Sequence, residues 1–530
     1  MPKKTRKMTV ICNGGVNQSV NANLMQPGEL RYGNNIVFAL DTTWTKAPGI
    51  TQYYSSGIDG FTDNSRYGID FFRTNATGNR VSQFIHYSGS SLYADNKDGI
   101  FTDITGTVSL FKNDFMTADV MGSYLCMGFE NVSPKKYNMT TFDDLETGGA
   151  GTAPNGKLVR LSSTLNVPGG FLWISGVDAY PNTLYYSAPN DPTDWTLGSG
   201  AGSIYIGGSD NDPLGITAIF PGYYGGLVVA KRKSLYLVQY NTSIADFTVQ
   251  TLVPGIGCIA HNAVVPVQND IIFPSEYGIH SLRSTDKYGN LDSTFLSFPI
   301  HNEYRKRIDF DRWKDMTAVF NEDLNSYLLS YPRRGDGGFN KNIMGFNIQT
   351  GKWFFWDNMD VGYLAKFSDR SLKTQTMVAQ KSNNLGYVDE STYLRFGEKI
   401  VMYCRTGLVY PAGLGNDAAF KRLTVIYKPE GESDIEIYYN LDGGNDKLLT
   451  YSQTGLEGDD LGEEFIPGVS KLGNIGEFKI KSFDLEGYGS GIEFTFIHTP
   501  TDDAPNKGCD IHMYIVEFQS AGDKETVVIQ

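Results

Sequence analysis

Closely spaced carboxylates are the side chains of this chain that could support chemistry. Asp191 and Asp194 precede Trp195, and Asp210 and Asp212 lie in the segment SDNDPLG. Paired carboxylates hydrolyse glycosidic bonds, and clustered oxygen ligands suit calcium. Both groups are also typical of turns, in which an Asp side chain accepts backbone N–H bonds. Because SDNDPLG lacks the terminal bidentate Glu of an EF-hand loop, we favour turns and predict no metal site. Asp210 and Asp212 remain the metal candidates.

The other reactive side chains match no catalytic or cofactor pattern. The six histidines form no HxxxH or HExxH pair, which argues against a zinc site. The five cysteines are far apart and form no CxxC pair, as expected of free thiols in a reducing compartment. The sequence contains no Walker A loop and no G-x-S-x-G elbow with a convincing His and Asp pair. We therefore predict no catalytic residue, no enzyme activity and no cofactor.

Basic clusters are the candidates for contact with a partner or with DNA. They lie in the N-terminal arm, between two strands, in the charged segment 301–314 that could be a short helix, and at a turn. The residues are Lys3, Lys4, Arg6 and Lys7; Lys231, Arg232 and Lys233; Arg305 and Arg307; Arg333 and Arg334. The alternative is that they are solvated loop charges. We favour the arm, because a flexible basic terminus can become ordered against a partner.

The composition is that of an acidic globular chain. It has 530 residues, of which 40% are hydrophobic, and a net charge of −14. This core content excludes an intrinsically disordered chain. Such an acidic chain does not wrap nucleic acid with its whole surface, although a passage through which DNA slides can be acidic. No window reaches 18 consecutive apolar residues, and no apolar run follows the basic N-terminus, so we expect neither a membrane span nor a secretory signal.

Short strands rather than helices must position these side chains. The chain holds 59 glycines, 32 tyrosines and 31 phenylalanines, which is typical of strands joined by tight turns. Between residues 56 and 394 the strands recur in groups, and the segment FNIQTGKWFFW is typical of the outer hairpin of a propeller blade. We therefore predict an all-β chain in which residues 56–394 form a β-propeller of about seven blades. An array of β-sandwiches is the alternative with the same strand lengths.

Two flanking regions differ from this repeat. Residues 395–530 alternate apolar and polar side chains with period two, which predicts a C-terminal antiparallel β-sandwich. The acidic stretch 442–464 within it is predicted to be a solvated insertion, and the sequence leaves its order open. Residues 1–55 are polar and predict an extended N-terminal arm with a ring-closing strand. On this interpretation, deletion of residues 1–25 leaves the propeller folded and weakens assembly.

Four features of the chain resemble the tail hub or nozzle proteins of short-tailed bacteriophages, also called packaged-DNA stabilisation or tail tubular proteins. The resemblance covers roughly residues 25–520. Its last feature is a sandwich that follows the propeller. The other three are the segments PGELRYGNNIVFALDTTWTKAPGI, LYYSAPNDPTDW, and GLVVAKRKSLYLVQYN followed by VPGIGCIAHNAVVPVQNDIIFPSEYGIHSL.

The resemblance implies a structural protein of the virion tail that is present in the host cytoplasm during assembly. Members of this family form a ring of six copies below the head-to-tail connector or adaptor, carry fibres or a spike, and leave a channel for the double-stranded DNA. Two other functions stay open. One is a propeller that binds or degrades glycans of the host surface. The other is a cellular scaffold, which the absence of WD and kelch regularity disfavours.

Overall fold

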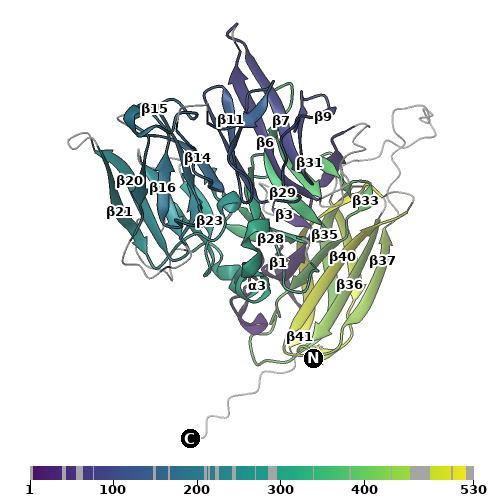
Figure 1. Cartoon of the computed structure of the whole chain (residues 1–530). Coiled ribbons are helices and arrows are strands. Elements are labelled where there is room, and N and C mark those ends of the chain that lie inside the picture. Colours follow the sequence, from purple (N-terminus) through teal and green to yellow (C-terminus); the bar gives the residue numbers. More distant parts are fainter. Residues whose placement is uncertain are drawn as a thin grey trace, which may run out of the picture.

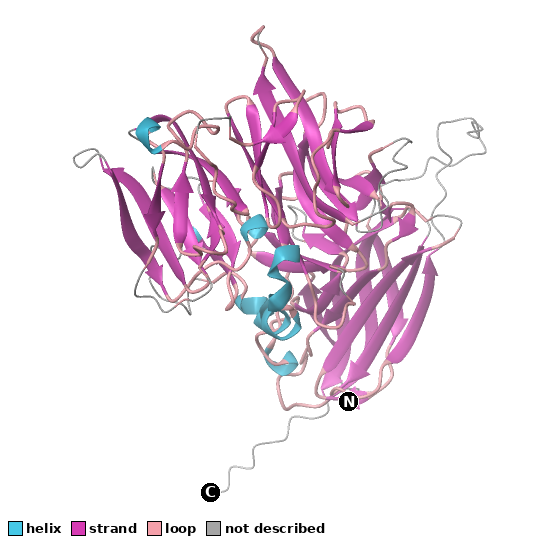
Figure 2. Ribbon diagram, in the orientation of Figure 1, coloured by secondary structure: helices cyan, strands magenta, loops and turns pink. Residues whose placement is uncertain are grey.

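A computed structural model of the chain is drawn in Figures 1 and 2, and nearly all of its ordered elements are strands. It describes residues 4–520 except 39–42, 55–63, 76, 147–150, 165–166, 208–211, 213–214, 221–225, 242–245, 269, 284–294, 338–339, 381–383, 431–432, 454–477 and 503–504. The prediction of an all-β chain is therefore confirmed. The helices of this part are η1 (Ala22–Leu24), η2 (Leu197–Ser199), η3 (His261–Ala263), η4 (Phe298–Ile300), α3 (His301–Arg307) and η5 (Phe310–Asp315). Within the residues described, none of these helices has the length and apolar character needed to cross a bilayer.

Four blades follow one another along the chain from β6 to β21, and each is a sheet of four consecutive antiparallel strands. Their strands are β6 (Ser65–Thr74), β7 (Arg80–Ser88), β8 (Ser91–Asp95) and β9 (Phe101–Asp103); β10 (Met116–Met121), β11 (Tyr124–Phe129), β12 (Lys135–Tyr137) and β13 (Phe142–Asp144); β14 (Leu158–Thr164), β15 (Val167–Ser175), β16 (Thr183–Tyr186) and β17 (Gly202–Tyr205); β18 (Ile216–Ile219), β19 (Leu227–Lys231), β20 (Ser234–Asn241) and β21 (Asp246–Pro254).

Three further sheets complete the ring, and the first strand of each blade faces the first strand of the next, as in the contacts of β29 with β6 and of β6 with β10. These sheets are β22 (Val265–Val267), β23 (Asp270–Pro274) and β24 (Ile279–Ser281); β25 (Thr317–Asn321), β26 (Ser326–Tyr331), β27 (Asn342–Asn347) and β28 (Lys352–Trp356); β29 (Val361–Ser368), β30 (Thr374–Gln380) and β31 (Leu385–Asp389) with β5 (Gly49–Gln52). Strand β5 pairs with β31 from Gly49↔Asp389 to Gln52↔Gly386, so the N-terminal region supplies the outer strand of the last blade.

The blade count differs slightly from the predicted seven. Six blades have four strands, and the sheet β22–β24 has three. A single bridge between His280 and Phe295 stands where a fourth strand would pair with β24. The chain then enters η4 and α3, so this sheet does not gain its outer strand from the residues that follow.

The blades are held together by aromatic side chains packed between neighbouring sheets. Phe247 of β21 lies 5.1 Å from Trp173 of β15 and 4.9 Å from Tyr186 of β16, measured between ring centroids. Trp173 is completely buried. Large rings fill the space between blades and contribute about 0.5–1.5 kcal/mol per pair beyond the burial of their area.

Two more sheets are built jointly by both ends of the chain. One joins β1 (Arg6–Ile11), β3 (Ile36–Phe38), β4 (Trp44–Lys46), β35 (Ala418–Glu430), β38 (Lys479–Asp484), β39 (Tyr488–Gly489) and β41 (Gly508–Ser520). The other continues the blade β25–β28 through β2 (Leu30–Asn34), β34 (Met402–Thr406), β40 (Ile492–Pro500), β36 (Ser433–Leu441) and β37 (Lys447–Gln453). The short strands β32 (Leu394–Arg395) and β33 (Glu398–Lys399) attach to β5.

Aromatic contacts connect these two sheets. The ring of Phe494 lies 5.3 Å from that of Tyr514, and the ring of Trp44 lies 6.3 Å from that of Phe496. Trp44 comes from the N-terminal region, and its Nε1 also donates to the carbonyl of Gly14 at 3.0 Å. The region appended to the propeller therefore includes N-terminal strands, which the sequence interpretation had assigned to an arm.

The segment that follows Thr5 is a strand and not a free arm. Strand β1 pairs with β41 from Arg6↔Phe518 to Ile11↔Met513, and Val10 is buried. This strand belongs to the appended sheet and not to a blade, so the prediction that the propeller stays folded without residues 1–25 stays a prediction, and the loss falls on the sheet of β41.

Removal of residues 1–11 is expected to lower the free energy of unfolding by about 2–3 kcal/mol, because β41 loses a paired strand and a buried valine. Removal of residues 1–5 is the matched control, with an expected change within about 0.5 kcal/mol. Urea denaturation of both variants measures the difference. Equal stability of the two truncations would mean that β1 adds nothing to the sheet.

Candidate functional site

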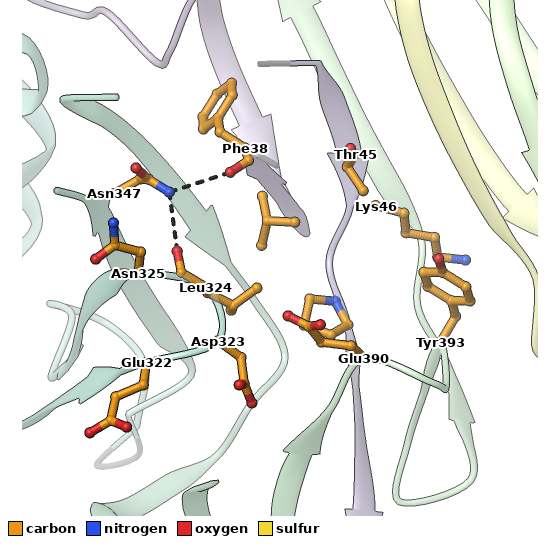
Figure 3. Close-up of a pocket in the computed structure, with 12 residues that line it drawn as sticks. Phe38, Thr45, Lys46, Glu322, Asp323, Leu324, Asn325, Asn347, Glu390 and Tyr393 are labelled. Carbon is orange, nitrogen blue, oxygen red and sulfur yellow. Dashed lines mark hydrogen bonds between the residues drawn. The ribbon is translucent and has the colours of Figure 1, made fainter. Parts of the chain in front are cut away.

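A cavity of about 770 Å³ lies between the blade β25–β28 and the segments that bring the chain into and out of the last blade. Its walls come from the turn between β25 and β26, from β3 and β4, and from the loop after β31 (Figure 3). The lining residues are Val37, Phe38, Thr45, Lys46, Pro48, Glu322, Asp323, Leu324, Asn325, Asn347, Glu390 and Tyr393.

Hydrogen bonds from Asn347 fix two walls of this cavity. Its Nδ2 donates to the carbonyl of Phe38 at 3.3 Å and to that of Leu324 at 3.1 Å (Figure 3). The amide thereby ties the N-terminal strand β3 to the turn that carries Asp323. Because Asn347 is itself buried, this connection is protected from competition by water.

Two carboxylates, Asp323 and Glu390, line the cavity from different walls (Figure 3). Burial raises the pKa of Glu390 above its usual value, and the negative charge of Asp323 raises it further. Glu390 therefore holds its proton to a higher pH than a free glutamate does. A carboxyl with a raised pKa next to a second carboxylate is an arrangement that general acid catalysis uses.

The rest of the cavity combines apolar and aromatic surface with one buried cation. Lys46 donates from Nζ to the carbonyl of Lys507 at 2.7 Å, and its ammonium group lies 5.7 Å from the ring centroid of Tyr393. Phe38 and Tyr393 supply ring faces. Glu322, by contrast, forms an ion pair with Lys366. Rings and carboxylates together can bind a sugar or a cationic apolar group.

Four of the predicted basic residues come together at α3. The backbone N–H of Arg334 donates to the carbonyl of Arg307 at 2.8 Å, and Arg333 pairs with Ile308. Arg305 lies on the same short helix. This arginine cluster (Arg305, Arg307, Arg333 and Arg334) is at the end of the β25–β26 hairpin opposite Asp323.

One buried acid partly neutralises the arginine cluster. Glu303 is 5% exposed, and its Oε2 lies 2.7 Å from Nε of Arg307. Burial raises the pKa of Glu303, and the charges of Arg307 and Arg333 oppose that effect. Arg305 has a different environment, because it lies 6.0 Å from the ring centroid of Tyr277. The cluster keeps a net positive charge for contact with an acidic surface.

The prediction that Lys231, Arg232 and Lys233 all contact a partner is wrong for Lys231. Lys231 is completely buried at the end of β19, where its Nζ donates to the carbonyl of Gly207 at 3.3 Å. Its side chain cannot reach a partner. Arg232 forms an ion pair with Glu276. Only the side chain of Lys233 is exposed.

Two of the N-terminal basic residues, Arg6 and Lys7, are exposed on a paired strand. Arg6 and Lys7 belong to β1, and the Nζ of Lys7 lies 2.7 Å from a carboxylate oxygen of Glu517. Lys4 is exposed just before the strand, and Lys3 lies outside the described residues. The prediction of a flexible arm is therefore wrong from Arg6 onward.

The aspartates singled out in the sequence occupy turns where they are described. Asp191 accepts from the N–H of Thr193 at 2.8 Å, and Asp194 accepts from the N–H of Thr196 at 2.8 Å. This hydrogen bond lowers the pKa of Asp194. Buried Asp212 accepts from the N–H of Lys233 at 3.1 Å.

In the described part of the chain, no metal site forms around Asp212. Asp210 lies outside the described residues. Within the chain that can be placed, no three His, Cys, Asp or Glu side chains gather in a way that could hold a metal ion. Of the acidic stretch 442–464, Asp442 accepts from the N–H of Gly491 at 2.7 Å, and residues 454–464 lie outside the described part.

The sequence interpretation missed the carboxylate pair Asp323 and Glu390. Each follows a strand, β25 and β31 respectively, and polar residues after strands are common in turns. No short motif contains both of them, because they lie in different blades. The folded chain was needed to bring them to one cavity.

Comparisons with known proteins give matches among solved structures alone. No family model matches it, and no curated protein matches it. The solved structures that it resembles include the computationally designed Ika8 protein, with 11% identity and a TM-score of 0.35 over 64% of this chain and 99% of that one. They also include YCF48 bound to D1 peptide, with 10% identity and a TM-score of 0.37 over 64% and 95%.

An exo-beta-1,3-galactanase from Phanerochaete chrysosporium is a third similar structure. It has 10% identity and a TM-score of 0.27, and the match covers 88% of this chain and 100% of that one. At these TM-scores neither a function nor a residue role is transferred to this chain.

Proposed function

We propose that the chain is a structural, non-enzymatic protein of a bacteriophage tail, a hub or nozzle. It assembles as a ring of about six copies below the head-to-tail connector, retains and conducts the double-stranded genome, and anchors fibres or a spike. The four sequence features given above support this proposal. For the fold, we further propose that β22–β24 is a seventh blade and that the two appended sheets form a β-sandwich.

The observation that carries the proposal is the way in which the chain ties two bodies into one. Strands β1, β3 and β4 enter the sheet of β41, β2 links the blade β25–β28 to β34, and β5 completes the last blade. The N-terminal region is thus shared among all three sheets. A part that transmits force along a tail requires such a connection, since a single flexible linker would let the bodies separate.

The proposed partners follow from the same interpretation. The arginine cluster at α3 is the better candidate for contact with the connector, with an acidic neighbouring copy or with DNA, because its four residues lie on α3 and on the segment bonded to the end of α3. Lys4 and Lys7 are secondary candidates. The protein would be located in the virion tail and, during assembly, in the host cytoplasm.

Quantitative mass spectrometry of virus particles banded from a lysate of the source tests the proposal. We expect several copies per particle in a fixed ratio to the connector protein. Particles without the chain, while the chain stays free in the supernatant, would overturn the tail assignment.

The cavity with Asp323 and Glu390 favours a second candidate, a propeller that binds or degrades a host surface glycan. Its two carboxylates, one with a raised pKa, and its aromatic side chains are the observation that supports it. Release of oligosaccharide from host capsule by the purified chain, abolished in Glu390→Gln and kept in the surface variant Arg370→Gln, would establish this activity. No release from any host glycan would exclude hydrolysis.

A further inference from the structure

A second, smaller cavity lies where the first strands of several blades converge. It has a volume of about 290 Å³ and is lined by residues of β6, β14, β22, β25 and β29 and by Asn262 of η3. Since the first strand of each blade faces the first strand of the next, this cavity is on the axis of the propeller. The proposed functions assign nothing to it.

The charge of this axial cavity is opposite to that of the whole protein. Its lining includes two cations, Arg160 and Lys366, and no Asp or Glu. The chain as a whole has a net charge of −14. An axial site with this lining attracts anions, whereas most of the surface repels them.

Arg160 is the central residue of the axial cavity. It comes from β14 and donates from Nε to the carbonyl of Ile219 in the adjacent first strand β18 at 3.3 Å. This bond holds the guanidinium in place and leaves its two terminal nitrogens for other partners. Over the chain as described, no carboxylate forms an ion pair with Arg160.

The nearby carboxylate of Asp119 is engaged elsewhere. Its Oδ2 accepts from the backbone N–H of Leu161 at 2.8 Å and its Oδ1 from that of Val120 at 2.8 Å. Beside the guanidinium, buried His261 accepts at Nδ1 from the N–H of Ile219 at 3.1 Å. The carbonyl of Ile219 thus accepts from Arg160, and the N–H of Ile219 donates to His261. Burial and the charge of Arg160 lower the pKa of His261, so the imidazole stays neutral and does not add to the positive charge.

The other walls of the axial cavity are mainly apolar and would contact the uncharged part of a ligand. Val264, Pro266, Val319 and Leu364 give apolar surface, and Tyr363 gives a ring. Asn262 donates from Nδ2 to the carbonyl of Met116 at 3.1 Å, which fixes its amide at the cavity. A volume near the lower end of ligand pockets admits one small ring or a short chain.

We propose that the axial cavity binds a small organic carboxylate, with Arg160 as the residue that binds the anion. The planar guanidinium forms charge-assisted bonds to the carboxylate, and the apolar walls hold the body of the ligand. Lys366 stands at the cavity with its charge shared with Glu322, so its contribution is the smaller one.

Titration calorimetry of the full chain with benzoate and with benzyl alcohol tests this site. The two probes share a ring and differ in charge. We expect benzoate to bind and benzyl alcohol to bind at least about tenfold more weakly, since hydrogen bonds to a charged group are worth about 1.5–3 kcal/mol. Equal binding of the two probes, or no binding of benzoate at millimolar concentration, would overturn the proposal.

Variants locate the binding. Arg160→Gln is expected to weaken benzoate binding by about tenfold or more, and Arg160→Lys by less, because lysine keeps the charge and loses the bidentate geometry. Arg305→Gln in the arginine cluster is the control and should bind benzoate as the unchanged chain does. Unchanged affinity in a folded Arg160→Gln would overturn the assignment of this residue. The comparison of the two probes needs no variant and stands if Arg160→Gln fails to fold.

Discussion

Replacement of Arg395 by methionine is expected to lower the free energy of unfolding by about 3–5 kcal/mol, because two buried hydrogen bonds from a charged group are lost. Arg395 is 7% exposed. Its Nη1 donates to the carbonyl of Asp357 at 2.7 Å, and its Nη2 donates to Oδ1 of Asn35 at 2.9 Å. Methionine fills a similar volume but removes both hydrogen bonds, and Oδ1 of Asn35 keeps only the backbone N–H of Asp357, at 3.1 Å.

The network around Arg395 joins three distant parts of the chain. Asn35 donates from Nδ2 to Oδ1 of Asp357 at 2.6 Å and to the carbonyl of Val401 at 2.8 Å, and Asn34 donates to Oδ2 of Asp357 at 3.1 Å. Burial lowers the pKa of Arg395 to about 10, and Asp357 acts against that effect. The guanidinium therefore stays charged at neutral pH, and both of its hydrogen bonds are donated by a charged group.

Backbone pairing between β2 and β28 alone joins the propeller only weakly to the appended sheets. Strands β2 and β28 share one parallel pair, Asn34↔Phe355, so the polar network adds the bonds that the ladder lacks. Guanidinium chloride denaturation of Arg395→Met measures its contribution. Arg370→Met is the control, because Arg370 is exposed and pairs with Asp98 at 3.3 Å. Its expected effect is within about 0.5 kcal/mol. If Arg395→Met loses no more than the control, the network does not hold the two bodies together.

Local patterns predicted the strands well because a strand's side-chain periodicity is local. The segment KWFFW forms β28 and pairs with β27, as the hairpin predicted from FNIQTGKWFFW requires. The period-two segment IEFTF lies in β40, and its Phe494 and Phe496 contact rings of the other appended sheet. The choice of partner strand was not predictable in the same way. Strands β1 to β5 follow one another in the chain and enter three different sheets, since pairing depends on packing of residues far apart in sequence.

Charged residues were also misjudged where tertiary packing decides their exposure. In KRK the sequence offers three equivalent basic residues, and the fold buries Lys231 while leaving Lys233 in solvent. Lys231 ends an otherwise apolar strand, LVVAK, whose every residue is buried. Its ammonium is accommodated because the long apolar stem packs with the strand and Nζ reaches the carbonyl of Gly207. No pattern within the three residues distinguishes them.

Acidification from pH 7 to pH 5 is expected to destabilise the protein by several kcal/mol, because its buried histidines must stay neutral. Burial lowers the pKa of His86 and His498 to about 3 and that of His280 to about 4. In the unfolded chain these groups have a pKa of about 6.5. Their stabilising contribution is therefore complete above pH 6.5 and is lost as the pH falls toward the folded values.

Each of these histidines costs up to about 1.4 kcal/mol per pH unit in this window, so three of them amount to roughly 6 kcal/mol at pH 5. Buried carboxyls act in the opposite direction. Burial raises the pKa of Asp70 and Glu303, so acidification favours their folded, protonated form. The free energy of unfolding therefore changes less steeply with pH than the histidines alone would make it change. A variant of one histidine isolates the contribution of that histidine.

His280→Gln provides that variant. Glutamine can keep a hydrogen bond to the hydroxyl of Ser275, which lies 2.9 Å from Nε2 of His280. Between pH 6.5 and 5 the free energy of unfolding of the variant should depend less steeply on pH than that of the unchanged chain. The difference in slope corresponds to the uptake of about one proton on unfolding. Between pH 7.5 and 8.5 the two slopes should be identical, which separates titration from a general loss of packing. Identical slopes in the acid window would mean that His280 takes up its proton without unfolding.

The positions of these histidines connect the acid transition to the network around Arg395. His86 lies in the blade of β7, His280 lies in β24, and His498 lies in the appended strand β40. Acid therefore weakens the propeller and the appended sheets together. Because the network joins these bodies, the unchanged chain should unfold in one transition at pH 5, and Arg395→Met should separate it into two. A single transition in both proteins would show that the shared N-terminal strands are sufficient for the coupling.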